Sequence, residues 1–200
     1  MKDLIIGVGS SSEKKSALAG KKAAILALDS FGDTSPDIAI VLASQRLEYR
    51  DLLRGIQSVI GEVPMVGGTT AGEVSIHGLG TDTIVICLIA SKKKSFHVAS
   101  ADNMSKDEED CGKCLAKKIT QNIEIDNAKS LVLFPDGLGG DGVSLLKGIQ
   151  SVLGRNFEIV GGFLGDDGQF KETFQFYNGK CYRGDLVSAI MISGDDQYVT

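Results

Sequence analysis

The sequence has no excess of basic residues and no hydrophobic run long enough to cross a membrane. Its 200 residues carry 21 Lys and Arg against 26 Asp and Glu, and the only basic cluster is the short run at 92–94. Non-specific nucleic-acid binding rests on clustered positive charge, so we expect no nucleic-acid partner. A membrane-spanning helix needs about 20 apolar residues, so we expect no membrane partner and a cytoplasmic location.

Histidine is also scarce, which limits the catalytic sets that the chain could form. A Ser-His-Asp or Cys-His set would have to use His77 or His97, and neither lies in a recognisable nucleophile motif. Cys111 and Cys114 have C-x-x-C spacing, but a structural zinc site needs a second such pair. The acids just before this pair disfavour a thiolate, so both are interpreted as ordinary helix cysteines. We predict no enzymatic activity and no bound metal.

One stretch of the sequence occurs twice. Residues 52–68 read LLRGIQSVIGEVPMVGG, and residues 145–162 read LLKGIQSVLGRNFEIVGG. The offset of 93 residues exceeds the roughly 20 to 50 residues of a solenoid repeat. The sequence therefore predicts a single domain over residues 1–200, made of two similar halves, 1–92 and 93–200, related by a pseudo-two-fold axis.

The pattern of apolar residues predicts the same β-α-β-α-β-β order in each half, and so an α/β fold with helices packed on β-sheets. Gly55 and Gly148 occupy the same place in the two copies of the repeated helix, which suggests a close approach of helix to sheet. An extra β-hairpin is expected in the second half, turning at Asn178-Gly179. The expected strands are 4–8, 37–43, 63–66, 83–90, 96–100, 130–134, 157–160, 173–177, 180–182 and 186–192, and the expected helices are 16–30, 48–60, 107–121 and 142–153.

Two glycine-rich loops follow the repeated strand, one in each half, and they differ in side chains. The first holds Thr69, Thr70, Gly72 and Glu73, whose hydroxyls and carboxylate could bind an ammonium-bearing ligand. The alternative is a turn in which the threonines satisfy local backbone groups. The second loop holds Gly165, Asp166 and Asp167, which could contact a ligand amine or form a solvated turn.

Another glycine-rich segment, residues 135–142, runs from a strand into a helix. Free N–H groups at the helix start beside Asp136 and Gly137 could hold an anion, but the segment lacks the Lys-Ser/Thr ending of a P-loop. Asp141 is expected to cap the helix instead. Residues 7–12 raise the same two alternatives at the first helix, with Ser12 or a neighbour as the cap.

Taken together, the segments GVGSSS, VGGTTAGEVS, FPDGLGGDG and VGGFLGDDG, with the FQFYNGKCYRG hairpin, resemble the N-terminal FIST domain over nearly the whole chain. The resemblance implies a non-catalytic sensory domain of signal transduction that binds a small polar ligand, with amino acids suggested. It also implies a partner, either a C-terminal FIST domain following this one or a signalling protein, and a homodimer is left open. We expect ligand specificity to come from the difference between the two glycine-rich loops.

Two further hypotheses remain beside this one. Some FIST-like proteins are reported to bind haem and respond to nitric oxide, and here His77 is the candidate axial ligand of a non-covalent haem; otherwise no cofactor is expected. The other hypothesis is a protein-interaction module without a small ligand.

Overall fold

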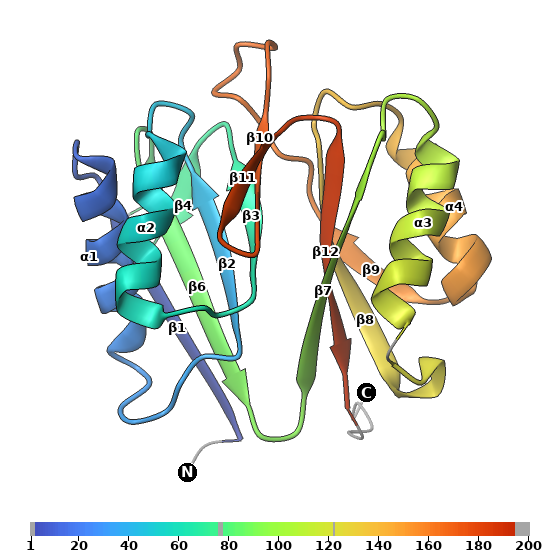
Figure 1. Ribbon diagram of the computed structural model, residues 1–200, viewed down its shortest axis with the longest axis horizontal. Helices are drawn as coiled ribbons and strands as arrows, with labels where there is room; N and C mark the ends of the chain where they lie inside the picture. The colour runs from blue at the N-terminus through green and yellow to red at the C-terminus, as the bar shows by residue number, and fades with distance from the viewer. Residues whose placement is uncertain (1–2, 76–77, 122, 195–200) are drawn as a thin grey trace.

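The computed structural model describes residues 3–75, 78–121 and 123–194. Two β-sheets face each other, and a pair of helices covers the outer side of each sheet (Figure 1). The predicted α/β class, with helices packed on duplicated sheets, is confirmed. None of the described helices is both long and apolar enough to span a bilayer.

The first half forms four strands of the first sheet, in the order β1-β6-β2-β3. Strands β2 and β3 run parallel and are joined by a helix, whereas β6 is antiparallel to both β1 and β2. The elements are β1 (Leu4–Ser11), α1 (Ser16–Leu28), β2 (Ile38–Ala43), α2 (Tyr49–Ile60), β3 (Met65–Thr69) and β6 (Ile84–Ser91).

The second half repeats this arrangement in the order β7-β12-β8-β9, with β8 and β9 parallel and β12 antiparallel to β7 and β8. The expected duplication is therefore present in the strand order, which the sequence alone did not reveal. The elements are β7 (Ser95–Asp102), α3 (Glu108–Thr120), the short 3-10 helix η1 (Ile125–Asn127), β8 (Ala128–Pro135), α4 (Gly142–Leu153), β9 (Glu158–Gly161) and β12 (Leu186–Ser193).

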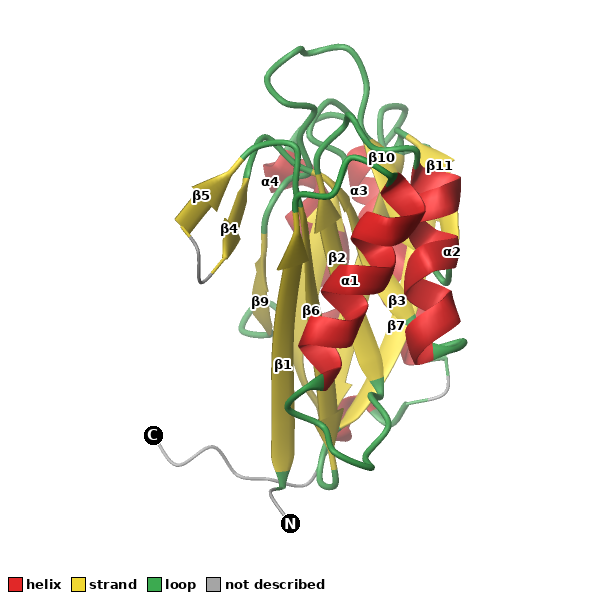
Figure 2. Cartoon of the chain, turned by 90° about the vertical axis from the view of Figure 1, so that its left-hand side faces the viewer, coloured by secondary structure: helices red, strands yellow, loops and turns green. Residues whose placement is uncertain are grey.

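Each half also carries a β-hairpin between its third and last sheet strands, and the two hairpins differ. Strands β4 (Glu73–Ser75) and β5 (Gly78–Gly80) form a separate two-stranded sheet that stands beside the main sheets (Figure 2). Strands β10 (Phe174–Tyr177) and β11 (Lys180–Arg183) cross to the first sheet, where β10 pairs antiparallel with β3. The second hairpin lies in the sequence where the Asn178-Gly179 turn predicted it. The strand that it pairs with, β3, belongs to the first half.

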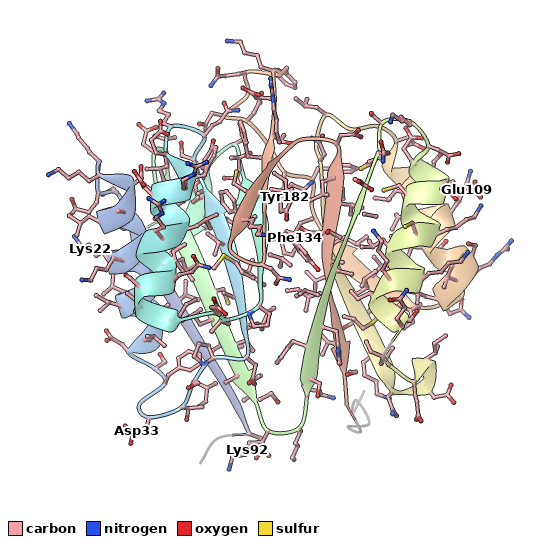
Figure 3. All side chains as sticks on the ribbon, viewed as in Figure 1. Lys22, Asp33, Lys92, Glu109, Phe134 and Tyr182 are labelled. Atoms are coloured by element: carbon pink, nitrogen blue, oxygen red, sulfur yellow. The ribbon has the colours of Figure 1, made fainter. Side chains whose placement is uncertain are left out.

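The buried apolar side chains of the described residues form three clusters. One lies between the first sheet and α1 and α2, and a second lies between the second sheet and α3 and α4. The third lies between the two sheets and includes Ile38, Val66, Phe134 and Ile190 (Figure 3, Phe134). Strand β2 contributes to the first and third clusters, which explains why its sequence is apolar without alternation.

The glycines of the repeated helix bring helix against helix, not helix against sheet. A Cβ built on Gly55 would lie 2.1 Å from the carbonyl oxygen of Ala17 on α1, and one on Gly148 would lie 2.0 Å from that of Glu109 on α3. Our expectation of helix-to-sheet contact was wrong at this position. The approach of the two backbones leaves no room for a side chain, which outweighs the cost of about 1 kcal/mol for glycine in a helix.

Two local predictions also need correction. Strand β1 continues through Ser11, and the N-cap of α1 is Lys15, which makes no capping bond, so Ser12 does not cap that helix. Strand β3 continues through Gly67, Gly68 and Thr69, which we had assigned to a loop. The cap at Asp141 is confirmed, because its carboxylate accepts the N–H groups of Val143 and Ser144.

Candidate functional site

The two glycine-rich loops that differ between the halves lie against each other at one end of the sheets. The N–H of Gly165 donates to the carbonyl of Thr69 (2.9 Å), and the N–H of Asp167 donates to the carbonyl of Thr70 (3.1 Å). A Cβ on Gly137 would meet the carbonyl oxygen of Leu164, so the 135–142 segment packs on the same place. The three segments picked from the sequence therefore form one cluster.

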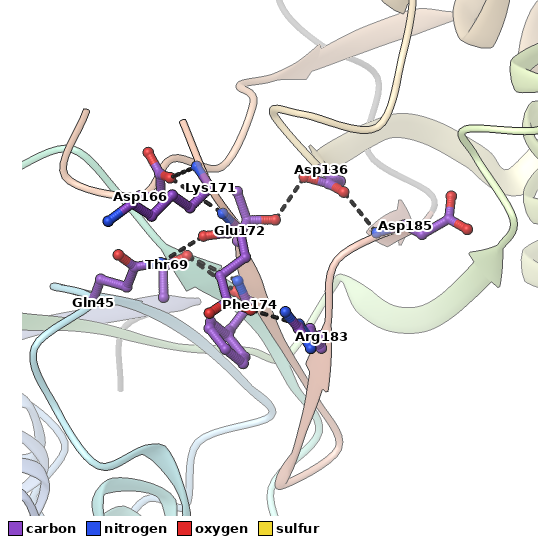
Figure 4. Close-up of polar contacts among 10 residues, drawn as sticks. Gln45, Thr69, Asp136, Asp166, Lys171, Glu172, Phe174, Arg183 and Asp185 are labelled. Atoms are coloured by element: carbon purple, nitrogen blue, oxygen red, sulfur yellow. Dashed lines mark hydrogen bonds and ion pairs between the residues drawn. The ribbon is translucent and has the colours of Figure 1, made fainter. Parts of the chain in front are cut away.

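Two aspartates of this cluster are buried and hold the backbone around them (Figure 4). Asp166 accepts the N–H groups of Phe170 (3.0 Å), Lys171 (2.6 Å) and Glu172 (3.3 Å). Burial raises the pKa of this carboxyl, but these donors outweigh burial and hold the pKa below its ordinary value. Because its oxygens already accept several bonds, Asp166 orders the loop that leads into β10.

Asp136 performs the same task on the opposite side of the cluster. Its carboxylate accepts the hydroxyl of Thr173 (2.6 Å) and the N–H groups of Leu138 (2.9 Å) and Asp185 (2.6 Å). It thereby ties the end of β8 to both ends of the β10–β11 hairpin (Figure 4).

Asp167 links the second loop to the first half. Its Oδ2 accepts the hydroxyl of Ser44 (3.0 Å) and the N–H of Gln45 (3.1 Å), just beyond the end of β2. Its own backbone has φ of 56°, a left-handed conformation that aspartate tolerates better than most residues. The link fixes the two halves at the end where the loops meet.

The first loop directs its polar groups to two different places. Thr69 is fully buried in β3, and its Oγ1 accepts the N–H of Phe174 (3.0 Å). Thr70 donates its hydroxyl to Oε1 of Glu73, and Thr83 donates to Oε2 of the same carboxylate. Glu73 is almost completely buried, with 3% of its surface exposed, and two hydroxyls fix its orientation.

A cavity of about 330 Å³ lies beside Glu73, between the end of β1, the side of α1 and the β4–β5 hairpin. Its polar lining combines serines and a threonine with one basic and one acidic residue; these residues include Ser10, Ser11, Ser12, Lys22, Glu73 and Thr83. The Lys22 ammonium lies 3.0 Å from Glu13 and is half exposed. The cavity thus presents both signs of charge and several hydrogen-bonding groups to one small space.

Sequence reasoning found only part of this lining. Glu73 was a candidate, and residues 7–12 were considered as an anion site, but Lys22 and Thr83 were missed. Lys22 is one of two adjacent lysines on α1, and Thr83 follows a glycine-rich stretch, so neither carried a signal. Gly72 precedes β4, with φ of 143° that favours glycine, and so directs the chain into this hairpin.

The second half has a cavity in the corresponding place, between the end of β7, α3 and the start of β12. Its volume is about 360 Å³, and its lining includes Asp102, Asn103, Lys118, Arg183 and Asp185. It holds two acidic and two basic side chains, whereas the first cavity holds one buried carboxylate, Lys22 and several hydroxyls. The duplicated frame therefore carries two chemically different cavities.

His97 and the four cysteines do not line the cavity beside Glu73. His77 lies outside the described residues, so the proposed haem ligand is not placed. His97 lies on β7, with Nε2 3.1 Å from the hydroxyl of Ser193. Burial raises the pKa of the Cys111 thiol to about 12, which agrees with an unreactive helix cysteine. Within the described part of the chain, no three His, Cys, Asp or Glu side chains form a metal-binding cluster.

The fold and its cavities define a duplicated α/β domain with paired polar cavities. The family model of the FIST N domain matches residues 37–200, most of the chain. The chain belongs to the FIST N domain family, a family of sensory domains generally thought to bind small ligands. A comparison with curated proteins gives no match.

Two solved structures are similar to the chain at a low level. A cyanuric acid hydrolase described as an innovation by structural concatenation is 11% identical, with a TM-score of 0.49, over 98% of this chain and 70% of that one. The cyanuric acid hydrolase of A. caulinodans is 12% identical, with a TM-score of 0.47, over 94% of this chain and 70% of that one. Similarity this low carries no argument about activity.

Proposed function

We propose that this chain is a non-catalytic sensory domain that binds a small polar metabolite, with amino acids as the first candidates, in the cavity beside Glu73. The observation that carries the proposal is a buried carboxylate, oriented by two threonine hydroxyls, in the wall of a cavity that also presents the Lys22 ammonium. Small-molecule sites commonly combine a volume of roughly 300 to 1,000 Å³ with a few fixed polar groups.

The chemistry of the lining matches a zwitterion. A carboxylate has about four lone-pair positions, and the hydroxyls of Thr70 and Thr83 use two of those on Glu73. The remaining positions suit a ligand ammonium group. The Lys22 ammonium and the hydroxyls of residues 10–12 suit a ligand carboxylate.

The aspartates of the loop cluster have contacts that suit a structural role in the site. A general acid or base needs an oxygen that reaches the substrate. The carboxylates of Asp136, Asp166 and Asp167 accept backbone and hydroxyl donors instead. In this proposal they hold the loops that place Thr70 and Glu73, and the domain performs no catalysis.

Thermal-shift measurements on the 200-residue chain test the proposal. A ligand at 100 times its Kd stabilises a protein by about 2.7 kcal/mol, which gives a clear rise in Tm. Among the amino acids and related small acids and amines, we expect at least one to raise Tm. Glu73→Gln, which keeps the shape and removes the charge, should abolish that rise, and Lys22→Met should weaken it.

Glu62→Gln is the matched control, because Glu62 is exposed and lies outside the cavity. It removes the same charge and should leave the ligand-induced shift unchanged. The proposal fails if no compound shifts Tm, or if the shift survives Glu73→Gln. The haem hypothesis stays a separate prediction, tested by whether added haem gives an absorption band that His77→Ala weakens.

A further inference from the structure

The strand β9 is the counterpart of β3 and shares its Val-Gly-Gly sequence, but it is exposed where β3 is buried. Val66 on β3 is fully buried, whereas its counterpart Val160 on β9 is 51% exposed. Phe163, just after β9, is 53% exposed, and its counterpart Thr69 is fully buried. Within the described residues, β9 pairs with β8 on one side and with no strand on the other. Proteins usually cover or charge such an edge, because its free backbone groups pair with other strands.

The first half shows what covers the equivalent edge. Strand β10 pairs antiparallel with β3, which sets Phe176 opposite Gly67. Phe176 is fully buried among α2 and the first sheet, and its ring lies 5.5 Å from the ring of Tyr49. An aromatic residue on an added strand therefore completes the first apolar cluster.

In the second half, the corresponding place is an open apolar cavity. Its volume is about 260 Å³, and its walls include Leu145, Leu146, Ile159, Gly161 and Phe163. Gly142 occupies the position that Tyr49 holds in the first half, and a Cβ there would lie 2.7 Å from the Phe163 ring. The Phe163 ring thus lies next to the place that Tyr49 holds in the first half, and the cavity is the open counterpart of the space that Phe176 fills.

The glycine after β9 gives independent support. A Cβ on Gly68 would lie 2.3 Å from the carbonyl oxygen of Phe174, so β10 leaves no room for a side chain there. Its counterpart Gly162 has open space, with no heavy atom within 4 Å of a Cβ. Nothing within the described structure requires glycine at this position, but a strand added to β9 as β10 is added to β3 would require it.

We propose that the outer edge of β9 is a docking site for an antiparallel β-hairpin from a partner protein, which places an aromatic side chain in the cavity at Gly161. The partner hairpin has aromatic or large apolar residues at alternate positions, as Phe174 and Phe176 stand on β10. Main-chain hydrogen bonds to β9 supply affinity, and the cavity supplies specificity. This surface shares no lining residue with the cavity beside Glu73.

The probe is a fluorescent, backbone-cyclised peptide of residues 172–184 with Cys181→Ser, titrated against the 200-residue chain by fluorescence polarisation. Cyclisation is needed because an isolated hairpin is only marginally stable. We expect saturable binding, and hydrogen exchange should slow at the amides of β9. Phe176→Ser in the peptide should weaken binding by about tenfold or more, since one buried aromatic side chain is lost.

The key variant is Gly162→Val. In the free chain, the new side chain meets open space, so the melting temperature should not fall, but the added strand is blocked and peptide binding should be lost. Gly68→Val should instead lower the melting temperature sharply, because β10 already occupies that space. These two variants separate a docking role from a structural role of the same residue type.

The proposal is overturned if the peptide does not bind and β9 exchange is unchanged. It is also overturned if binding survives both Phe176→Ser and Gly162→Val, since the cavity then plays no part. A third contrary result is self-association of the chain that Gly162→Val abolishes while the peptide fails to bind. In that case a second copy, for example through its exposed Val74 and Leu79, covers the edge.

Discussion

Strands β3 and β9 both lead into a Val-Gly-Gly sequence, at 66–68 and 160–162, but they lie in opposite environments. Every residue of β3 is buried, whereas three of the four residues of β9 are exposed. The difference comes from the second hairpin, which leaves its own half and pairs with β3. A strand's burial is therefore decided here by a segment about a hundred residues away, and not by the strand's own residues.

The largest predicted difference in stability comes from truncating the aromatic residue next to β3 and the one next to β9. Phe176→Ala removes a fully buried ring and should destabilise the protein by about 3–5 kcal/mol. Phe163→Ala removes a ring that is half exposed and should cost about 1 kcal/mol or less. Urea unfolding of both variants measures the difference. Equal losses would show that β9 is covered in solution.

A second prediction concerns acid stability. The carboxyl of Asp166 has a pKa below its ordinary value, so folding favours its ionised form. Its contribution to stability is fully present above the unfolded pKa of about 3.9, and is lost as pH falls through the lower folded pKa. Asp166→Asn should lower stability at neutral pH and flatten the acid limb of the stability curve.

Unfolding in urea at a series of pH values between neutrality and the acid limb provides this measurement. Asp51→Asn on the exposed face of α2 is the control, because its carboxylate is 56% exposed and only forms a surface ion pair with Arg54. If both variants keep the same acid limb, Asp166 does not hold the loop in the way its contacts indicate.

The smallest predicted effect compares the first helix of each half. Asp107 is the N-cap of α3 and accepts the N–H of Asp110 (2.8 Å), whereas Lys15 is the N-cap of α1 without a side-chain bond. Asp107→Ala should cost about 1 kcal/mol, and Lys15→Asp should stabilise by up to about 1 kcal/mol. Thermal unfolding measures both. A loss of stability in Lys15→Asp would contradict the capping argument.

Much of the fold followed from local patterns in the sequence. The repeat predicted the duplication, the apolar spacing predicted the helices, and Asn178-Gly179 predicted the hairpin turn. The third strand was predicted to end at residue 66, because glycine is a poor strand former. The structure extends this strand through Gly67 and Gly68, and only the neighbouring strands explain why these glycines belong to it. The destination of the hairpin was unreadable, because it depends on pairing between distant segments.

In the candidate site, too, local patterns were readable from the sequence and contacts between distant segments were not. Glu73 stood out because a carboxylate followed two hydroxyls in a glycine-rich loop, and the structure places it beside a cavity. Lys22 lies on α1 and Thr83 directly precedes β6, and both line the same cavity as Glu73 because the folded chain places these elements side by side. The aspartates of the second loop were predicted as ligand contacts, and the contacts that they make in the structure are with backbone N–H groups and a hydroxyl.

Because the second hairpin pairs with β3, the N-terminal sheet can be completed only after residues of the second half have been synthesised. Phe174, which bonds to Thr69, is made 105 residues after it. Until then no strand lies beside the edge of β3, and the space that Phe176 occupies in the first apolar cluster is unfilled. The edge of the N-terminal sheet is thus completed by a segment of the second half, which ties the two copies of the duplication together.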